Sequence, residues 1–289
     1  MTLTALTALG LVLLGFGAGT LGALVGVGGG IIVVPTLVLG FHVGIKTAIA
    51  TSLVAVVATS TAAGSVYVGR GLTNMRLAMT LETFTTLGGI AGGVIAVWIA
   101  PSALAAMFGV IMGLTATLLL RTKDPLPRPA AAPSGPAVLG AELPGRLAGS
   151  YYDAHAGRLV EYEAVRLPLG AAASAAAGVI SGLLGVGGGF LKVPAMALGM
   201  NVPIKVAAAT SSFMIGVTAI ASLFIYLARG YVSPLIAAPV ALGVSVGALL
   251  GTRLAARVSG RLLRRVLSVI VIAVGIQMLL RAVGISLVP

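Results

Sequence analysis

The sequence predicts an all-α integral membrane protein built from two related halves, and three observations support this. First, 58% of the 289 residues are hydrophobic and only 8% are charged, a composition outside the range of soluble globular domains. Second, charge-free stretches such as residues 1–45 and 83–120 exceed the ~20 apolar residues that span a bilayer as a helix. Third, the run GVGGGIIVVP at residues 26–35 recurs 159 positions later as GVGGGFLKVP.

The duplication extends well beyond these two runs. Over residues 26–53, 16 of 28 positions are identical to those 159 residues later. In the same register Tyr67 matches Tyr226 and Gly92 matches Gly251, so the repeat units cover residues 10–120 and 169–279. Internal duplication of a membrane chain is typical of transporters. We divide the chain into membrane repeat 1 (residues 1–120), a linker (121–167) and membrane repeat 2 (168–289).

Each half is predicted to contain five apolar helical segments. They are residues 3–25, 31–39, 45–68, 76–100 and 102–120, then 168–184, 190–198, 204–227, 234–255 and 262–283. The second segment of each half covers only about half of a ~30 Å hydrocarbon core, at ~1.5 Å per residue. We therefore expect broken helices at the glycine runs, and about eight to ten transmembrane segments in all.

The positive charges predict that the two halves are inverted relative to each other. With five crossings per half, residues 70–76, 121–166 and 253–265 share one side and carry 13 Lys and Arg residues, against only Arg229 and Arg281 opposite. Four crossings per half would remove this asymmetry. By the positive-inside rule, the linker is cytoplasmic and both termini lie outside. The proline-rich linker is expected in water, with a short helix or strand near residues 151–165.

Composition also excludes several functional classes. The net charge is +12, but the basic residues are scattered between apolar spans and form no stripe with aromatic residues, so we expect no nucleic-acid partner. The absence of cysteine excludes disulfides and thiolate sites, and two histidines with six acids argue against a metal centre, a cofactor site or an enzyme. The glycine runs lack the lysine of a P-loop and the later acid of a dinucleotide site. The sequence leaves the oligomeric state open, a homo-oligomer included.

Each glycine run is predicted to break a helix, because a glycine destabilises a helix interior by ~1 kcal/mol relative to alanine. Pro35 and Pro194 each remove a further backbone donor. Irregular backbone is tolerated in a membrane only inside the protein or beside a water-filled cavity, and half-helix N-termini favour anions. Either the two breaks meet near the midplane around an anion-binding cavity, or they only allow close packing of helices.

Three lysines near the breaks are candidate anion contacts. Lys46 and Lys205 recur in both halves in the first turn of a helix, where the dipole disfavours a cation. Each therefore holds an anion, pairs across the repeat interface, or extends its ammonium to the headgroups. Lys192 has no twin, since Val33 takes its place. It is predicted to contact an anion, to form a structural pair, or likewise to reach the headgroups.

Further polar residues complete the predicted site. Glu82, the only acid outside the linker, either couples transport to protons or pairs with Arg76 or Arg70. The hydroxyls that follow Lys46 and Lys205 either bind an oxyanion or bond to their own helix backbone. The predicted substrate-binding residues are Gly26, Gly28, Gly29, Gly30, Pro35, Lys46, Thr51, Ser52, Gly185, Gly187, Gly188, Gly189, Lys192, Pro194, Lys205, Thr210 and Ser211.

The two copies of GVGGGxxxVP, each followed by a lysine-bearing turn and a Thr-Ser pair, resemble the duplicated motif of the TauE/SafE family of sulfite exporters, also called sulfonate uptake permeases. The resemblance covers both halves and leaves only the linker outside. It implies a multi-pass carrier in the bacterial cytoplasmic membrane for small sulfur-containing anions such as sulfite, thiosulfate or an organosulfonate. The predicted function is thus a secondary transporter that works by alternating access. The alternative is an anion channel, or a transporter of another small carboxylate or oxyanion.

Overall fold

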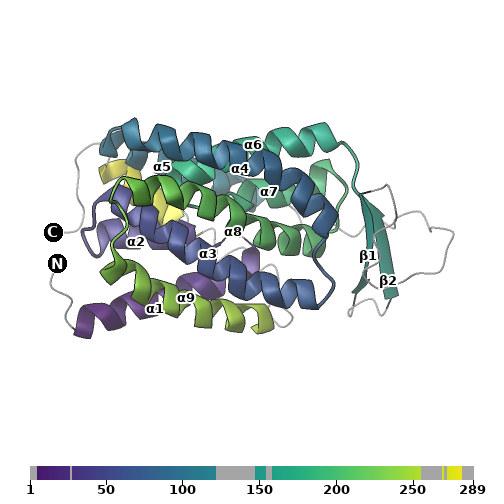
Figure 1. Cartoon of the computed structure of the whole chain (residues 1–289), viewed down its shortest axis with the longest axis horizontal. Helices are drawn as coiled ribbons and strands as arrows, with labels where there is room; N and C mark the ends of the chain where they lie inside the picture. The colour runs from purple at the N-terminus through teal and green to yellow at the C-terminus, as the bar shows by residue number, and fades with distance from the viewer. Residues whose placement is uncertain are drawn as a thin grey trace.

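The computed structural model describes residues 5–26, 28–121, 147–153, 158–254, 269 and 272–281. Six of its helices are long and apolar enough to cross a membrane, and the long helices lie side by side along the longest dimension of the molecule (Figure 1). Hydrophobic side chains such as Leu13, Leu87 and Phe224 are exposed on their outer surfaces. These features confirm a polytopic all-α membrane protein.

The predicted segments occur in the predicted order. In the first half they are α1 (Ala5–Val25), α2 (Gly30–Leu39), α3 (Ile45–Gly69), α4 (Met75–Trp98) and α5 (Pro101–Arg121). In the second half they are α6 (Leu167–Leu184), α7 (Gly189–Pro194), the π-helical η1 (Ala195–Gly199), α8 (Ile204–Ala228), α9 (Pro234–Leu254) and the helix Ile272–Arg281. The last predicted segment, residues 262–283, lies partly outside the described residues.

Local signals position several helix ends. Asn74 precedes α4, and its side chain accepts a hydrogen bond from the Leu77 backbone N–H (3.0 Å), which satisfies an otherwise unpaired donor of the first turn. Gly185 ends α6 in the left-handed conformation, with φ of 68°, and its N–H donates to the Ser181 carbonyl at 2.8 Å. A glycine at this position costs little because it has no Cβ.

The second segment of each half is short, as predicted. α2 has 10 residues, and α7 with η1 spans residues 189–199, which is about half of a ~30 Å core. The two copies differ in one respect, because a π-helical turn follows Pro194 whereas α2 continues as an α-helix past Pro35. Proline has no N–H to donate to the preceding turn, and in the second copy the Met200 N–H reaches back to the Ala195 carbonyl.

The two halves are inverted, because the corresponding helices α3 and α8 run antiparallel. Near the end of α3, a Cβ on Gly64 would lie 3.7 Å from Phe213 Cα in the early part of α8. Just beyond α3, the Asn74 N–H donates to Thr210 Oγ1 (3.1 Å). At the start of α3, Lys46 Nζ lies 5.7 Å from the ring centroid of Tyr231, beyond the end of α8. Helices related by duplication run in opposite directions only if the halves have opposite orientations.

Two glycine-lined helix pairs flank the α3–α8 pair. α1 packs against α9, and the corresponding helices α6 and α4 pack against each other. Gly243 and Gly251 of α9 meet Val12 and Thr20 of α1, so these two helices run in the same direction. In each contact a Cβ on the glycine would overlap a backbone carbonyl of the partner helix. Small residues thus allow the backbones of these helices to approach closely.

A β-hairpin covers one end of the helices, which we call the hairpin end (Figure 1). β1 (Ala148–Asp153) pairs antiparallel with β2 (Arg158–Glu163), so the second part of the linker, predicted as a helix or a strand, forms two strands. Tyr151 and Tyr162 pack with Leu77 of α4 and Met196 of η1. The hairpin is therefore docked on the helices rather than extended into solvent.

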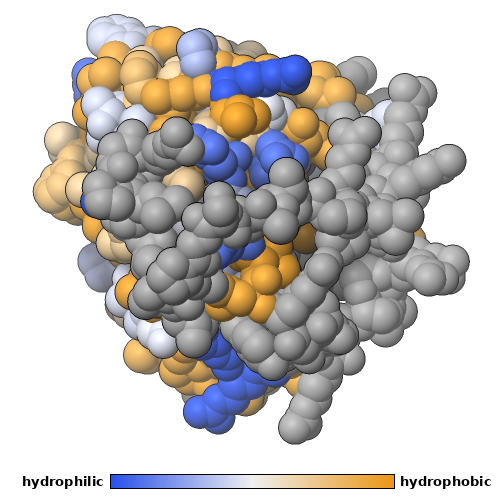
Figure 2. All heavy atoms as spheres, turned by 90° about the vertical axis from the view of Figure 1, so that its right-hand side faces the viewer, coloured by the Kyte–Doolittle hydropathy of each residue, from blue (hydrophilic) through white to orange (hydrophobic). Residues whose placement is uncertain are grey.

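The basic turns share this hairpin end. Arg70 Nη1 donates to the Thr252 carbonyl (3.4 Å) near the end of α9, and Asn74 Nδ2 donates to the Tyr162 hydroxyl (3.2 Å). Figure 2 views the molecule from this end and shows hydrophilic residues gathered among hydrophobic ones. The turn 70–76, the hairpin and the end of α9 therefore lie on the same side, as the inverted topology requires.

Candidate functional site

The two glycine motifs, residues 26–30 and 185–189, meet at the interface between the halves, and each is bonded to a serine of the opposite half. Ser52 Oγ on α3 donates to the Gly185 carbonyl (2.7 Å), and Ser211 Oγ on α8 donates to the Gly26 carbonyl (3.3 Å). Both serines are fully buried. The bonds are reciprocal, since each half supplies one hydroxyl donor and one broken helix, and we call this contact region the seam.

The backbone of the motifs explains why they consist of glycine. Gly26, Gly28 and Gly29 have positive φ values of 75°, 88° and 70°, and their counterparts in the second copy have 68°, 78° and 69°. L-residues other than glycine rarely adopt this conformation. Gly30 has another reason, because a Cβ there would overlap the Gly185 carbonyl and lie 2.7 Å from Ser52 Oγ. The motifs therefore both break the helices and allow the halves to touch.

Two tyrosines bind the helix ends that precede the breaks. The Tyr67 hydroxyl donates to the Ala23 carbonyl at the end of α1 (3.0 Å), and the Tyr226 hydroxyl donates to the Gly182 carbonyl at the end of α6 (2.9 Å). The last carbonyls of a helix have no partner within the helix, and in a membrane they need one. The matching of Tyr67 to Tyr226 in the repeat was the available sequence signal, but it did not reveal this contact.

A buried ion pair lies beside the second motif. Lys192 Nζ on α7 is 3.8 Å from Glu82 Oε2 on α4, with the lysine side chain fully buried. Glu82 Oε1 accepts hydrogen bonds from Thr218 Oγ1 (2.6 Å) and Thr86 Oγ1 (3.1 Å). The charged partner of Glu82 is thus Lys192 of the other half, rather than the Arg76 or Arg70 expected from the sequence. Sequence reasoning missed Thr218, which is 136 residues from Glu82.

The other lysines are placed differently. Lys46 Nζ donates to the Val97 carbonyl near the end of α4 (2.6 Å) and faces the Tyr231 ring of the second half. A cation at a helix C-terminus satisfies a terminal carbonyl and interacts favourably with the dipole. Lys205, the second residue of α8, is exposed at the hairpin end. The structure therefore brings Lys192 together with Glu82, but it places the Lys46 and Lys205 side chains on opposite sides of the seam.

The threonines of the two Thr-Ser pairs also differ from each other. Both Thr51 and Thr210 are fully buried. Thr210 Oγ1 accepts the Asn74 N–H, whereas Thr51 Oγ1 has no hydrogen-bond partner among the described residues. Ser181 Oγ, one turn before Gly185, is likewise buried without a partner there. Hydroxyl groups near the first half of α3 and the end of α6 thus retain bonding capacity.

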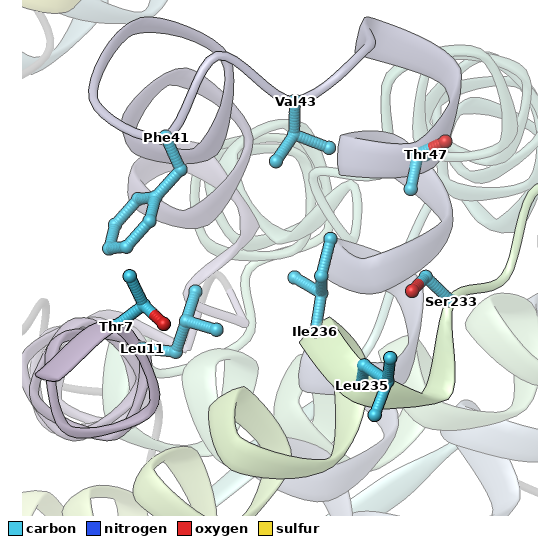
Figure 3. A pocket seen from close by; sticks show the side chains of 8 residues that line it. All are labelled: Thr7, Leu11, Phe41, Val43, Thr47, Ser233, Leu235 and Ile236. Carbon is cyan, nitrogen blue, oxygen red and sulfur yellow. The ribbon is translucent and has the colours of Figure 1, made fainter. Parts of the chain in front are cut away.

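A cavity of about 270 Å³ opens at the end opposite the hairpin, which we call the pocket end. Side chains of Thr7, Phe41, Thr47 and Ile236 surround it from α1, the turn after α2, α3 and α9 (Figure 3). This cavity is not the one expected from the sequence, because the two glycine motifs pack against each other at the seam. No group of three or more metal-binding side chains occurs in the described parts of the chain.

Comparisons with known proteins agree with this architecture. The family model described as "Sulfite exporter TauE/SafE" matches residues 11–278. The chain is also 30% identical, over 241 residues, to the "Probable membrane transporter protein YunE" of Bacillus subtilis (strain 168), which covers 81% of this chain and 83% of that protein. No solved structure matches the chain. The chain is therefore a multi-pass membrane transporter that belongs to the TauE/SafE family.

Proposed function

We propose that this protein is a secondary transporter that moves small sulfur-containing anions, such as sulfite, thiosulfate or an organosulfonate, across the bacterial cytoplasmic membrane by alternating access. One observation carries the mechanism: the seam is made of reciprocal contacts between two inverted halves, Ser52 to Gly185 and Ser211 to Gly26. The anion class comes from family membership.

Inverted halves support alternating access for a physical reason. If the two halves exchange their conformations, a site that is open to one side of the membrane becomes open to the other. The contacts at the seam are individually weak, since a neutral hydrogen bond contributes about 1 kcal/mol net. The seam can therefore rearrange without a large loss of stability, whereas the glycine-packed pairs α1–α9 and α4–α6 would move as units.

The proposed anion site lies along the seam. Backbone N–H groups of Gly26, Gly28, Gly29 and Gly30, those of their counterparts in the second motif, and four hydroxyls would donate to anion oxygens once the seam rearranges. In this structure several of these donors, such as the N–H groups of Gly26 and Gly185, bond to carbonyls of the preceding helix. Lys192 would supply the positive charge. Lys46 and Lys205 would flank the two sides of the path. The hydroxyls are those of Thr51, Ser52, Thr210 and Ser211, and Pro35 and Pro194 lie in the half-helices that follow the two breaks.

The orientation is also part of the proposal. The basic residues at the hairpin end support a cytoplasmic linker under the positive-inside rule. The pocket-end cavity would then face the outside of the cell, beside the first turns of α1 and α9.

The test is transport by purified protein in proteoliposomes. Radiolabelled sulfite, thiosulfate and sulfoacetate are presented singly, with protein-free liposomes as the control. We expect saturable uptake of at least one anion, and acceleration of its uptake when the same unlabelled anion is loaded inside. Uptake without this counterflow would indicate a channel, and the absence of uptake of all three would contradict the proposed substrate class.

A further inference from the structure

The Glu82–Lys192 pair breaks the symmetry between the halves. In the register of the duplication, Lys192 corresponds to Val33 and Glu82 corresponds to Ala241. The equivalent positions of the other copy therefore carry no charge, although the same fold is built around them. A pair that served only to hold the fold would be expendable, since buried ion pairs are often replaced by apolar residues without loss of stability.

The bonding of the pair is incomplete. Its closest approach of 3.8 Å exceeds the ~2.7–3.2 Å of a hydrogen bond. Lys192 Nζ and Glu82 Oε2 are both buried and have no hydrogen-bond partner among the described residues. An ammonium has three N–H donors and no acceptor. The donors of Lys192 are thus free to bind the oxygens of an anion.

The pair is connected to the seam along α8. Thr218, which donates to Glu82, is seven residues after Ser211, which donates to Gly26. Residues seven apart lie on one face of a helix, about 10 Å apart along its axis. Lys192 itself lies three residues after the last glycine of the second motif. The Glu82 contact of α8 is therefore two helical turns beyond its Gly26 contact, on the same face of α8, and Lys192 connects the pair to the second motif.

Few other titratable groups face the pair. α6 has none, and on α8 Lys205 is exposed near the start while the Tyr226 hydroxyl donates to Gly182. On α4 itself, Arg76 is exposed six residues earlier. From the hairpin, Tyr162 accepts from Asn74 Nδ2, and Tyr151 is buried beside Leu77 and Leu81. Glu82 and Lys192 therefore form an isolated pair within the described part of the chain.

We propose that this pair couples anion transport to protons: a transported anion replaces the Glu82 carboxylate as the counter-charge of Lys192, while Glu82 takes up one proton. This inference rests on the proposed function. A monoanion added beside the ion pair would leave one uncompensated buried negative charge, which is strongly unfavourable. Protonation of Glu82 restores neutrality, and the O–H bond of the acid is the only covalent bond that forms. Anion and proton therefore bind together and move in the same direction.

Proton uptake by the purified protein tests the inference without a variant. Methanesulfonate is the probe, because this sulfonate stays ionised across the physiological pH range and neither binds nor releases protons itself. On adding it to weakly buffered wild-type protein in detergent, we expect the uptake of about one proton per bound anion, as linkage requires when binding favours the protonated acid. Binding without proton uptake would overturn the inference.

Flux measurements with Glu82→Gln provide the second test. In wild-type proteoliposomes, an acid-outside gradient should accumulate methanesulfonate about tenfold for each pH unit, and a membrane potential should have no effect because no net charge moves. In Glu82→Gln, which cannot bind the proton, any flux should instead carry negative charge and respond to the potential alone. Electroneutral, gradient-driven accumulation by this variant would overturn the inference.

Two further variants separate coupling from folding. Glu161→Gln makes the same chemical change on β2 and should accumulate the anion as the wild type does. The double variant Glu82→Ala/Lys192→Val copies the residues of the other half and should fold but show no anion-linked proton uptake. Proton uptake that persists in the double variant would overturn the inference. Absence of any anion binding or flux in the wild type would instead contradict the proposed function itself.

Discussion

At the scale of single residues, the contact between the halves depends on side chains that are short or missing. Gly30 touches the Gly185 carbonyl because it has no Cβ, and the Ser52 hydroxyl reaches the same carbonyl. A larger residue at position 30 would force the two broken helices apart. The same atoms therefore determine both the stability of the seam and its geometry.

We expect Gly30→Ala to destabilise the folded protein by about 1–3 kcal/mol, the usual cost of overpacking a core, because the new Cβ would overlap backbone that cannot move freely. Thermal unfolding followed by circular dichroism in detergent measures this change. Gly17→Ala is the matched control, since a Cβ there would meet no atom within 4 Å and alanine is the better helix former. If Gly30→Ala unfolded no earlier than Gly17→Ala, the close contact at the seam would be contradicted.

At the scale of elements, the hairpin is the part of the structure that has no counterpart in the duplication. Tyr151 and Tyr162 bury their rings against α4, η1 and the turn before α8, which lie next to Glu82 and Lys192 in sequence. The hairpin therefore covers the parts of α4 and η1 that are next in sequence to Glu82 and Lys192. In the proposed alternating-access cycle, opening toward this side would require these contacts to separate.

We expect Tyr162→Ala to loosen this cover, because removing a buried aromatic ring costs about 3–5 kcal/mol. The chain has no cysteine, so a single Met200→Cys reports opening through its reaction with a maleimide. Met200 is fully buried under the hairpin, and its labelling rate should rise at least about tenfold in the Tyr162→Ala background. Val165→Cys, at a position 45% exposed, should react alike in both backgrounds. Equal labelling of Met200→Cys in the two backgrounds would show that the hairpin does not cover this site.

At the scale of the whole molecule, inversion is the property that relates the fold to transport. The antiparallel pair α3–α8 lies between the parallel pairs α1–α9 and α4–α6. The duplication relates α3 to α8 within the central pair, and it relates the pair α1–α9 to the pair α6–α4. Within each half, the half-length segment α2 or α7–η1 leads the chain back toward the side on which that half began. An odd number of segments per half then reverses the orientation of the second copy.

Equivalent positions in the two halves should therefore be labelled from opposite sides of the membrane. Gly69 and Ala228 are the last residues of α3 and α8, and both are exposed. With an impermeant maleimide on intact cells, Ala228→Cys should react, while Gly69→Cys should react only after permeabilisation, because the hairpin end is proposed to be cytoplasmic. Labelling of both positions from the same side would contradict the inverted topology in the membrane.

The sequence by itself determined the membrane class, the duplication, the helical segments to within a few residues, and the positions of both breaks. These properties follow from hydropathy, glycine and proline, which act on the local backbone and need no knowledge of the partner helices. The charges of the loops also predicted inversion, since they respond to the membrane rather than to packing.

Only the tertiary structure decided which side chains meet. Glu82 and Lys192 are 110 positions apart, and Ser52 and Gly185 are 133 apart, so no local pattern links them. The structure also showed that the glycine motifs pack against each other, and that the Lys46 ammonium binds a helix end rather than the seam. Such contacts depend on how whole helices pack, where shape and the need to satisfy every buried polar group select one arrangement.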